Sequence, residues 1–340
     1  MGKKMKTLTV CSYYGTGSSA VTDFFCEFDN VNSYSYMELR FAHDPDGLSE
    51  LEYNLVQNFN RHNSGHALKR YKKFVDYFSS HFLTKRYESI FKGRWKELSY
   101  NYIEKLTDFS FPGMWDFDGY DNGPWWEFWH KLPNRILKVL KGGTVDCEAG
   151  LWSKEITYAS HPSEEKFLRV TKEYTDSLFE CLNNERKDFL MLDQIVPSSN
   201  IEHHMRYFNN LKVFVVDRDP RDLYLICKYV YNSRIAPKDP DLFCQWYEYA
   251  RSTRKEENWD PAKICFIQFE DLIYKYDESA EKLMAFAGLK NEHHINPKTC
   301  FNPAVSIKNT RLWIQHPEYK GEADYIAQKL PEYLYHFDGE

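Results

Sequence analysis

The sequence predicts an α/β protein built on a parallel sheet with helices on both faces. Short apolar segments flanked by polar or turn residues are typical of buried strands, and they occupy residues 7–12, 189–192, 212–217 and 264–269, with a weaker fifth at 31–37. Segments with the apolar periodicity of helices lie between these strands. Short all-apolar strands that alternate with helices favour a parallel sheet covered on both sides.

Apolar spacing and end signals indicate the helices. Ser49 and Glu52 have the spacing of a capping box at a helix start. Apolar side chains recur at helical spacing over 68–78, 167–181 and 280–287, and Gly288 is placed to end the last of these helices.

Strands cluster at the start and in the second half of the chain, whereas residues 45–185 are mostly helical. Because no repeat and no Pro- or Ser-rich linker divides the chain, we expect a single α/β domain over residues 1–340. A long, mainly helical, aromatic-rich insertion is expected at about 45–185.

Composition excludes several protein classes. The 340 residues include 44 Lys and Arg against 50 Asp and Glu, a net charge of −6, which argues against a nucleic-acid-binding protein because such proteins need a basic surplus. No apolar run reaches the ~18–20 residues of a membrane span. The eight cysteines form no Cys-x-x-Cys pair, which predicts reduced thiols in a cytoplasmic protein. His62 and His66 lack a nearby third ligand, so no metal site is predicted.

A glycine turn follows the first strand, in the segment Gly15-Thr16-Gly17-Ser18-Ser19, and we expect a helix to begin at Ser18. Glycines let backbone N–H groups approach an anion closely. The helix start adds free donors and the positive end of the helix dipole, and the serines add hydroxyls. The pattern therefore predicts a phosphate site.

Several kinds of phosphate site fit this turn. A Walker-type loop needs a lysine after its second glycine, and none follows Gly17. The relaxed dinucleotide pattern Gly-x-Gly-x-x-Ala fits residues 15–20, and Glu38 lies near the end of the next strand, where a ribose-binding acid would sit. The regular strand and helix alternation of a dinucleotide fold is missing after that strand. A glycine turn without a ligand also stays open.

A second anion site is predicted where the strand at 212–217 ends in Arg218. Asp219 and Pro220 fit the N-cap and the first position of a following helix. Open α/β sheets bind ligands at the carboxyl ends of their strands, and a guanidinium presents a planar fork of donors to a phosphate. Pairing of Arg218 with Asp219 or Asp222 is the structural alternative.

With these two sites the chain resembles the sulfotransferases that use 3′-phosphoadenosine 5′-phosphosulfate (PAPS). In that family a strand, loop and helix near the N-terminus hold the 5′-phosphosulfate, and a later strand ending in Arg-[Asn/Asp]-Pro-[Lys/Arg]-Asp supplies an arginine to the 3′-phosphate. The resemblance assigns the first role to Gly15, Thr16, Gly17, Ser18 and Ser19, and the second to Arg218 within 218–222. A third match, the Glu-Asp-Leu segment at 267–273, is a fold marker.

The resemblance implies a P-loop-like central parallel sheet flanked by helices, and it suggests Lys308 and Arg311 as further ligands of the 3′-phosphate. The chain also departs from the family. Gly15 stands where the family loop carries a lysine or arginine, and Ile226 stands where many members have a serine.

Sulfuryl transfer is expected to need a base for the acceptor hydroxyl, cations for the leaving phosphate and in-line positioning, without a metal. The segment 36–47 follows the second strand and is expected beside the glycine loop. Arg40 is predicted to supply the missing loop charge. His43 is predicted to be the base because histidine titrates near neutral pH, with Glu38 and Asp44 as rival bases.

Together these features predict a cytoplasmic sulfotransferase that moves the sulfuryl group of PAPS to an acceptor hydroxyl and releases 3′,5′-adenosine bisphosphate (PAP). A glycan, glycolipid, sterol or phenol would suit the rings at 109–129, which are expected to shape the acceptor site. One alternative is an NAD(P)-dependent oxidoreductase in which Glu38 contacts a ribose and Arg218 is dispensable. The other is a non-catalytic PAP- or nucleotide-binding protein, which the missing loop lysine favours.

Overall fold

The computed structural model describes residues 5–80, 86–142, 155–183, 185–232 and 235–337. The chain divides into two compact units, which are taken one at a time below. The sheet unit comprises residues 1–44 and 182–340, and the helical unit comprises residues 45–181. The extent of the helical unit corresponds to the insertion expected at 45–185, of which 81–85, 143–154 and 184 lie outside the described residues.

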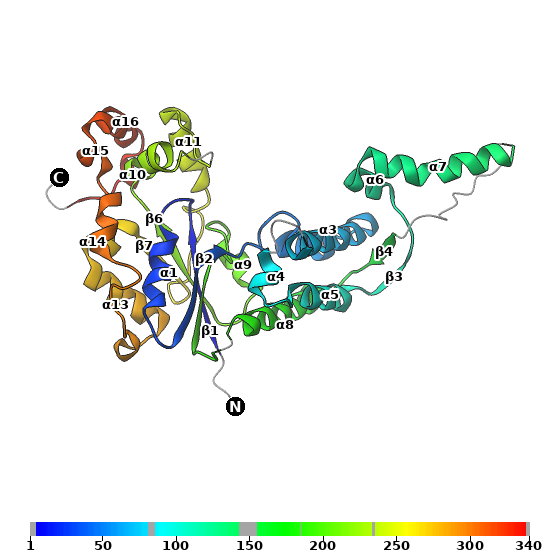
Figure 1. Cartoon of the computed structure of the whole chain (residues 1–340), viewed down its shortest axis with the longest axis horizontal. Helices are drawn as coiled ribbons and strands as arrows, with labels where there is room; N and C mark the ends of the chain where they lie inside the picture. The colour runs from blue at the N-terminus through cyan, green and yellow to red at the C-terminus, as the bar shows by residue number, and fades with distance from the viewer. Residues whose placement is uncertain (1–4, 81–85, 143–154, 184, 233–234, 338–340) are drawn as a thin grey trace. The chain divides into compact units, whose positions relative to one another are not determined.

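The sheet unit is built on five parallel strands in the order β2-β5-β1-β6-β7. Figure 1 labels β1, β2, β6 and β7 of this sheet. These strands are β1 (Lys6–Ser12), β2 (Val31–Glu38), β5 (Phe189–Asp193), β6 (Leu211–Asp217) and β7 (Ile264–Gln268). All five predicted strands are present. The predicted fold class, a parallel sheet flanked by helices with a long helical insertion, is confirmed.

Both faces of this sheet are buried, as all-apolar strands require. Side chains alternate along a strand, so Leu8 and Val10 face one side, where they join a core cluster with Phe24 and Leu283. Thr9 and Cys11 point to the opposite face and are also buried.

The helices of the sheet unit follow the predicted signals closely. Helix α1 begins at Ser18, and α13 ends at Gly288, whose φ of 77° lies in the left-handed region that glycine favours. Asp219 caps α10 by accepting from the Arg221 N–H at 2.8 Å. The α-helices are α1 (Ser18–Cys26), α9 (Ile201–Met205), α10 (Pro220–Leu225), α11 (Pro240–Ala250), α12 (Phe269–Tyr274), α13 (Tyr276–Ala287), α14 (Pro303–Ser306), α15 (Leu312–Gln315) and α16 (Lys320–Lys329). Shorter turns are the π-helical η2 (Ile226–Val230) and the 3₁₀ turns η3 (Asn291–His293), η4 (Ile307–Asn309), η5 (Pro317–Tyr319) and η6 (Pro331–Tyr333).

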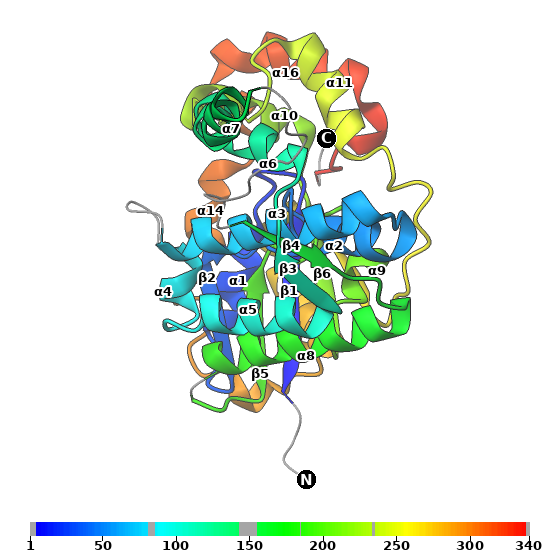
Figure 2. The same cartoon turned by 90° about the vertical axis from the view of Figure 1, so that its right-hand side faces the viewer.

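The helical unit packs its aromatic residues against one another. Tyr102 and Tyr174 stack at 4.5 Å between ring centroids, and the Tyr71 hydroxyl donates to that of Tyr174 at 3.1 Å. Its elements are α2 (Leu48–Glu52), η1 (Tyr53–Gln57), α3 (Arg61–Ser80), α4 (Arg86–Ile90), α5 (Trp95–Leu106), α6 (Asp116–Asn122), α7 (Pro124–Leu140), α8 (Glu164–Leu182) and a hairpin of β3 (Phe109–Pro112) with β4 (Ile156–Ala159) (Figure 2).

One predicted cap is wrong. Helix α2 begins after Gly47 with no side-chain cap, so Ser49 lies inside the helix rather than at its N-cap. The Glu50 carboxylate instead accepts from the Asp46 N–H at 2.9 Å, and this bond takes the place of the expected capping box. The local pattern therefore predicted the helix correctly but placed its N-cap two residues too late in the sequence.

A buried ion cluster closes the end of β6. Arg251 is fully buried and donates both Nε and Nη2 to the Asp217 carboxylate, and Arg254 Nη1 donates to the same group at 2.7 Å. Removing a partner from a buried ion pair leaves an uncompensated charge, which costs far more than the loss of an exposed pair.

We expect Asp217→Ala to lower the free energy of unfolding by about 3–5 kcal/mol, because it leaves two guanidinium groups without their carboxylate partner. Urea denaturation followed by circular dichroism measures the loss. Asp324→Ala, which breaks an exposed pair with Lys320, is the matched control and should leave the midpoint unchanged. Equal effects of the two substitutions would contradict the structural role of Asp217.

Candidate functional site

The loop between β1 and α1 adopts a backbone that suits few residues other than glycine. Tyr14, Gly15 and Gly17 have φ values of 63°, 71° and 102°. A Cβ placed on Gly17 would lie 2.4 Å from Cδ2 of Phe269, so any side chain would displace that ring. Gly17 therefore allows the loop to turn tightly into α1, as the sequence predicted.

Thr16 holds this loop to the sheet rather than facing a ligand. Its buried hydroxyl donates to the Val216 carbonyl at 2.7 Å and accepts from the Tyr13 N–H at 3.3 Å. The side chain of Thr16 thus makes a positioning contact, and the predicted binding role of this residue stays a prediction. Ser18 and Ser19 line a cavity at the start of α1, together with Gly15 and Gly17.

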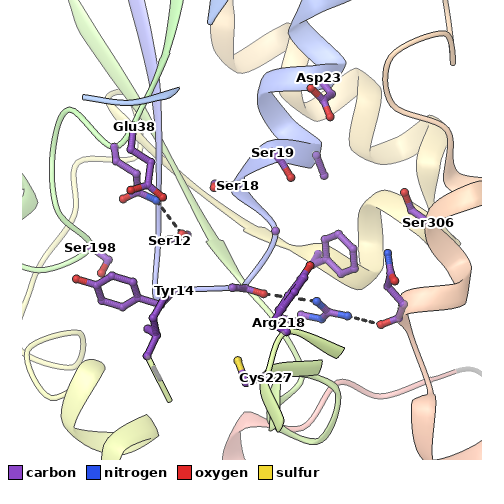
Figure 3. A pocket seen from close by; sticks show the side chains of 18 of the residues that line it. Ser12, Tyr14, Ser18, Ser19, Asp23, Glu38, Ser198, Arg218, Cys227 and Ser306 are labelled. Atoms are coloured by element: carbon purple, nitrogen blue, oxygen red, sulfur yellow. Dashed lines mark hydrogen bonds between the residues drawn. The ribbon is translucent and has the colours of Figure 1, made fainter. Parts of the chain in front are cut away.

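The cavity has a volume of about 540 Å³ and lies at the carboxyl ends of the strands (Figure 3). Arg218 lies in its wall opposite the start of α1. The segment after β2 contributes Glu38, Arg40 and His43, and the segment after α14 contributes Asn309. The structure therefore brings together residues from both predicted anion sites and from the predicted catalytic segment.

Arg218 is 3% exposed and only partly satisfied by the protein. Its Nη1 donates to the Gly15 carbonyl at 3.5 Å, its Nη2 donates to the Asn309 carbonyl, and its guanidinium lies 4.6 Å from the centre of the Phe269 ring. Nε is buried and has no hydrogen-bond partner among the described residues. A buried donor without a partner is a costly state, so this guanidinium is incompletely satisfied by the protein.

The carboxyl groups around Arg218 differ in their charge at pH 7. Burial raises the pKa of Glu270 to about 8, so this side chain is mostly neutral at pH 7, and its Oε1 accepts from the Asp219 N–H at 2.9 Å. Burial also raises the pKa of Asp222 to about 6, so this carboxyl is mostly ionised at pH 7, and its oxygens accept from the N–H groups of Arg311 and Leu312. Among the described residues Arg218 forms no direct ion pair with Asp219 or Asp222, although the charge of Asp222 acts on it.

Lys308 and Arg311 do not line the cavity wall in this conformation, although Ser306 and Asn309 beside them do. Lys308 is exposed, and Arg311 lies 5.1 Å from the centre of the Phe337 ring. Their predicted contact with a phosphate stays a prediction. The sequence motif thus identified the correct segment, and within it Ser306 and Asn309 form the cavity wall.

Arg40 and His43 lie on the side of the cavity formed by the end of β2. Arg40 pairs with Asp44 at 3.2 Å and Glu38 at 3.6 Å, so these two rival bases both contact a cation. Burial, with His204 and Arg40 nearby, lowers the pKa of His43 to about 3. The imidazole is neutral at pH 7, and its Nδ1 has no hydrogen-bond partner among the described residues. A neutral imidazole can accept a proton, but a pKa this low makes His43 a weaker base than the near-neutral histidine that the sequence predicted.

Asp193 does not line the cavity but contacts Ser18, which does, and the sequence reasoning missed this contact. It ends β5, and the Ser18 hydroxyl donates to its Oδ2 at 3.4 Å, while Oδ1 is buried without a partner among the described residues. Burial and the nearby Glu38 raise its pKa to about 7. Its signal was available, since Asp193 directly follows an apolar strand whose carboxyl end lies beside β1.

A second cavity, of about 620 Å³, lies inside the helical unit. Two stacked pairs form much of its wall: Phe59 with His161 at 3.5 Å, and His62 with Trp115 at 4.4 Å. Phe109 and Phe111 of β3 also line it. Among the predicted acceptor-site rings, those of α7 are absent from this wall as the structure describes it.

The strand order bears on the dinucleotide alternative. The usual dinucleotide-binding sheet places the second strand directly beside the first. Here β5 lies between β1 and β2, so Glu38 follows a strand that does not neighbour β1. The Gly-x-Gly-x-x-Ala pattern at 15–20 therefore occurs outside the topology in which it binds NAD.

Comparisons with known proteins return sulfotransferases among the solved structures. The sulfotransferase domain of the Synechococcus PCC 7002 olefin synthase is 10% identical, with a TM-score of 0.42 and coverage of 95% of this chain and 94% of that one. The sulfotransferase domain of the curacin biosynthetic pathway is 13% identical, with a TM-score of 0.43 and coverage of 98% and 100%. Retinol dehydratase in complex with androsterone and PAP is 12% identical, with a TM-score of 0.33 and coverage of 99% and 85%.

No family model and no curated protein matches the chain. Among the described residues, no helix is both long and apolar enough to cross a membrane.

The raised pKa of Asp193 predicts a pH-dependent stability. Between about pH 4 and pH 7 the unfolded carboxyl loses its proton while the folded one keeps it, so ionisation favours unfolding as the pH rises. We expect Asp193→Asn to raise the free energy of unfolding by about 1–3 kcal/mol at pH 8 and to change it little at pH 4. Urea titrations at the two pH values measure this, and equal shifts at both would contradict it.

Proposed function

We propose that the chain is a sulfotransferase that moves the sulfuryl group of PAPS to an acceptor hydroxyl and releases PAP. The observation that carries the proposal is one cavity lined both by the start of α1 and by Arg218, the two features from which the sequence predicts anion binding. PAPS carries anionic groups at the 5′ and 3′ positions of its ribose, and the two features suit those groups.

The residues fit the donor in two respects. Gly15 and Gly17 line the cavity, and the N–H groups at the start of α1 have no side-chain cap. The Arg218 guanidinium supplies a charge that Glu270 does not neutralise at pH 7. We assign the phosphosulfate to the loop 15–19 and the 3′-phosphate to Arg218, with Lys308 and Arg311 as further ligands.

The chemistry that PAPS supplies is an activated S–O bond to a good leaving group, which breaks as the acceptor oxygen bonds to sulfur. In our proposal His43 accepts the proton of the acceptor hydroxyl, because it lines the cavity beside the predicted phosphosulfate loop. Arg40 stabilises the charge that develops on the departing phosphate, in place of the lysine that Gly15 replaces. The acceptor is a small-molecule or glycan hydroxyl, with glycans, glycolipids, sterols and phenols as the classes to screen.

A second candidate is a protein that binds PAP or another nucleotide without turnover. The specific observation that favours it is Gly15 at the basic position of the loop, with Arg40 already engaged by Asp44 and Glu38. Both candidates share the cavity, so only a transfer assay separates them. The NAD(P) alternative is disfavoured by the strand order.

We expect Arg218→Ala to weaken PAP binding about 10–100-fold, since a charge-assisted hydrogen bond contributes roughly 1.5–3 kcal/mol. Calorimetric titration with PAP, beside NAD and ATP, measures the affinity. If the alanine variant unfolds, Arg218→Lys serves in its place, because it keeps the positive charge and the fold. Its affinity for PAP should still fall, because lysine lacks the planar fork of donors that a guanidinium has. Lys263→Ala, an exposed cation of the same unit, is the control. Unchanged PAP affinity in both Arg218 variants would remove Arg218 from the site.

For His43→Ala we expect loss of sulfuryl transfer with PAP affinity retained, because the base acts only on the acceptor. Transfer from ³⁵S-labelled PAPS to the acceptor panel gives the rate, and calorimetry gives the affinity. Arg40→Ala should slow transfer and also weaken PAP binding. A near-normal rate in His43→Ala together with a lost rate in Glu38→Gln would move the role of base to Glu38.

A further inference from the structure

Helix α7 is amphipathic along its whole length. At about 100° per residue, its apolar side chains fall on one half of the helix surface and its charged side chains on the other. The apolar face consists of Trp125, Trp126, Phe128, Trp129, Leu132, Pro133, Ile136, Leu137, Val139 and Leu140. An apolar face of this size normally packs against a core.

The described part of the chain buries none of the residues of α7. Trp125 is 76% exposed, Val139 81% and Leu140 75%. By contrast α5 in the same unit buries Trp95 and Leu106. Contiguous exposed apolar surface of this kind marks a contact with something outside the described residues.

The polar half of α7 is basic. Lys131, Arg135 and Lys138 lie on it, Lys141 follows its last residue, and Glu127 is the one acid of the helix. Lys131 pairs with Glu127, whereas Arg135 and Lys138 have no carboxylate partner among the described residues. This local positive charge stands out in a chain whose net charge is −6.

We propose that α7 is a membrane-surface helix, whose aromatic face enters the headgroup region of an anionic lipid bilayer. Tryptophan and phenylalanine on one face with lysine and arginine on the other is the pattern of helices that lie in the plane of the interface. At about 1.5 Å per residue its 17 residues extend about 25 Å, and they lie flat because the basic half excludes a span.

Charge favours lipid over a second copy of the chain. Arg135 lies at the edge of the apolar face beside Phe128 on the helical projection. Two such faces packed together would bring their basic edges close, whereas anionic headgroups would neutralise them. The proposal stands apart from the proposed function, because no residue of α7 lines the cavity of the sheet unit.

The test is sedimentation of the full chain with vesicles of phosphatidylcholine containing 30% phosphatidylglycerol, beside vesicles of phosphatidylcholine alone. We expect at least tenfold tighter binding to the anionic vesicles and a loss of that preference at high salt. Trp125→Ser with Trp129→Ser should weaken binding at least tenfold. Arg135→Glu with Lys138→Glu should remove the preference for anionic lipid.

Matched controls come from equally exposed positions elsewhere. Tyr249→Ser on α11 and Lys105→Glu with Arg169→Glu on α5 and α8 should leave vesicle binding unchanged. Equal vesicle binding by the wild type and the double-serine variant would overturn the proposal. So would absence of vesicle binding with a dimer in light scattering that the double-serine variant abolishes, which would assign the face to a second copy.

Discussion

The buried carboxylate of Asp217 is the interaction on which the candidate site depends. It is held by Arg251 and Arg254, and one of its oxygens also accepts from the Arg218 N–H at 2.8 Å. The end of β6 is thereby fixed in a dry environment, where a carboxylate with several donors resists displacement. Arg218 follows directly, and its side chain is delivered to the cavity by a backbone that cannot shift.

The same strand end positions the other half of the site. Thr16 bonds to the Val216 carbonyl, so the glycine loop is tied to the residue just before Asp217. Phe269, which follows β7, contacts both Gly17 and the Arg218 guanidinium. The two predicted anion-binding features therefore share one support, which is formed by β6 and Phe269.

Electrostatics in this cavity depend on burial more than on counting charges. Glu270, Asp222 and Asp193 surround the loop and Arg218, and three carboxylates would repel an anion. Burial raises the pKa of each of them, to about 8, 6 and 7, so a large share of that negative charge is absent near neutral pH. A loop without a lysine can then attract an anion through backbone N–H groups and one guanidinium. The site should for the same reason lose affinity for anions as the pH rises, because each carboxyl that ionises opposes the bound charge.

The sequence was sufficient for the sheet because its strands are apolar throughout and end in polar residues. Arg218 and Ser18 were placed correctly for that reason, as were Gly288 and the Asp219 cap. The sequence could not give the inward direction of Thr16, the protonation of Glu270 or the unpartnered Nε of Arg218, since these depend on contacts between segments about 50 to 200 residues apart. The strand order, which separates β1 from β2 and disfavours the dinucleotide alternative, is likewise a property of the folded sheet.

Aromatic residues show why composition alone misleads. Tyr71 and Val75 of α3 lie four residues apart and are buried in the helical unit, and Trp125 and Trp129 of α7 have the same spacing and are exposed. Periodicity identifies an apolar face in both cases and says nothing of what covers it. The charged half of each helix distinguishes the two cases. The core helix α5 carries both acids and bases on its outer face, whereas α7 carries almost only bases. An exposed aromatic face opposite a basic one is what an anionic surface selects, whereas a protein core requires only the apolar half.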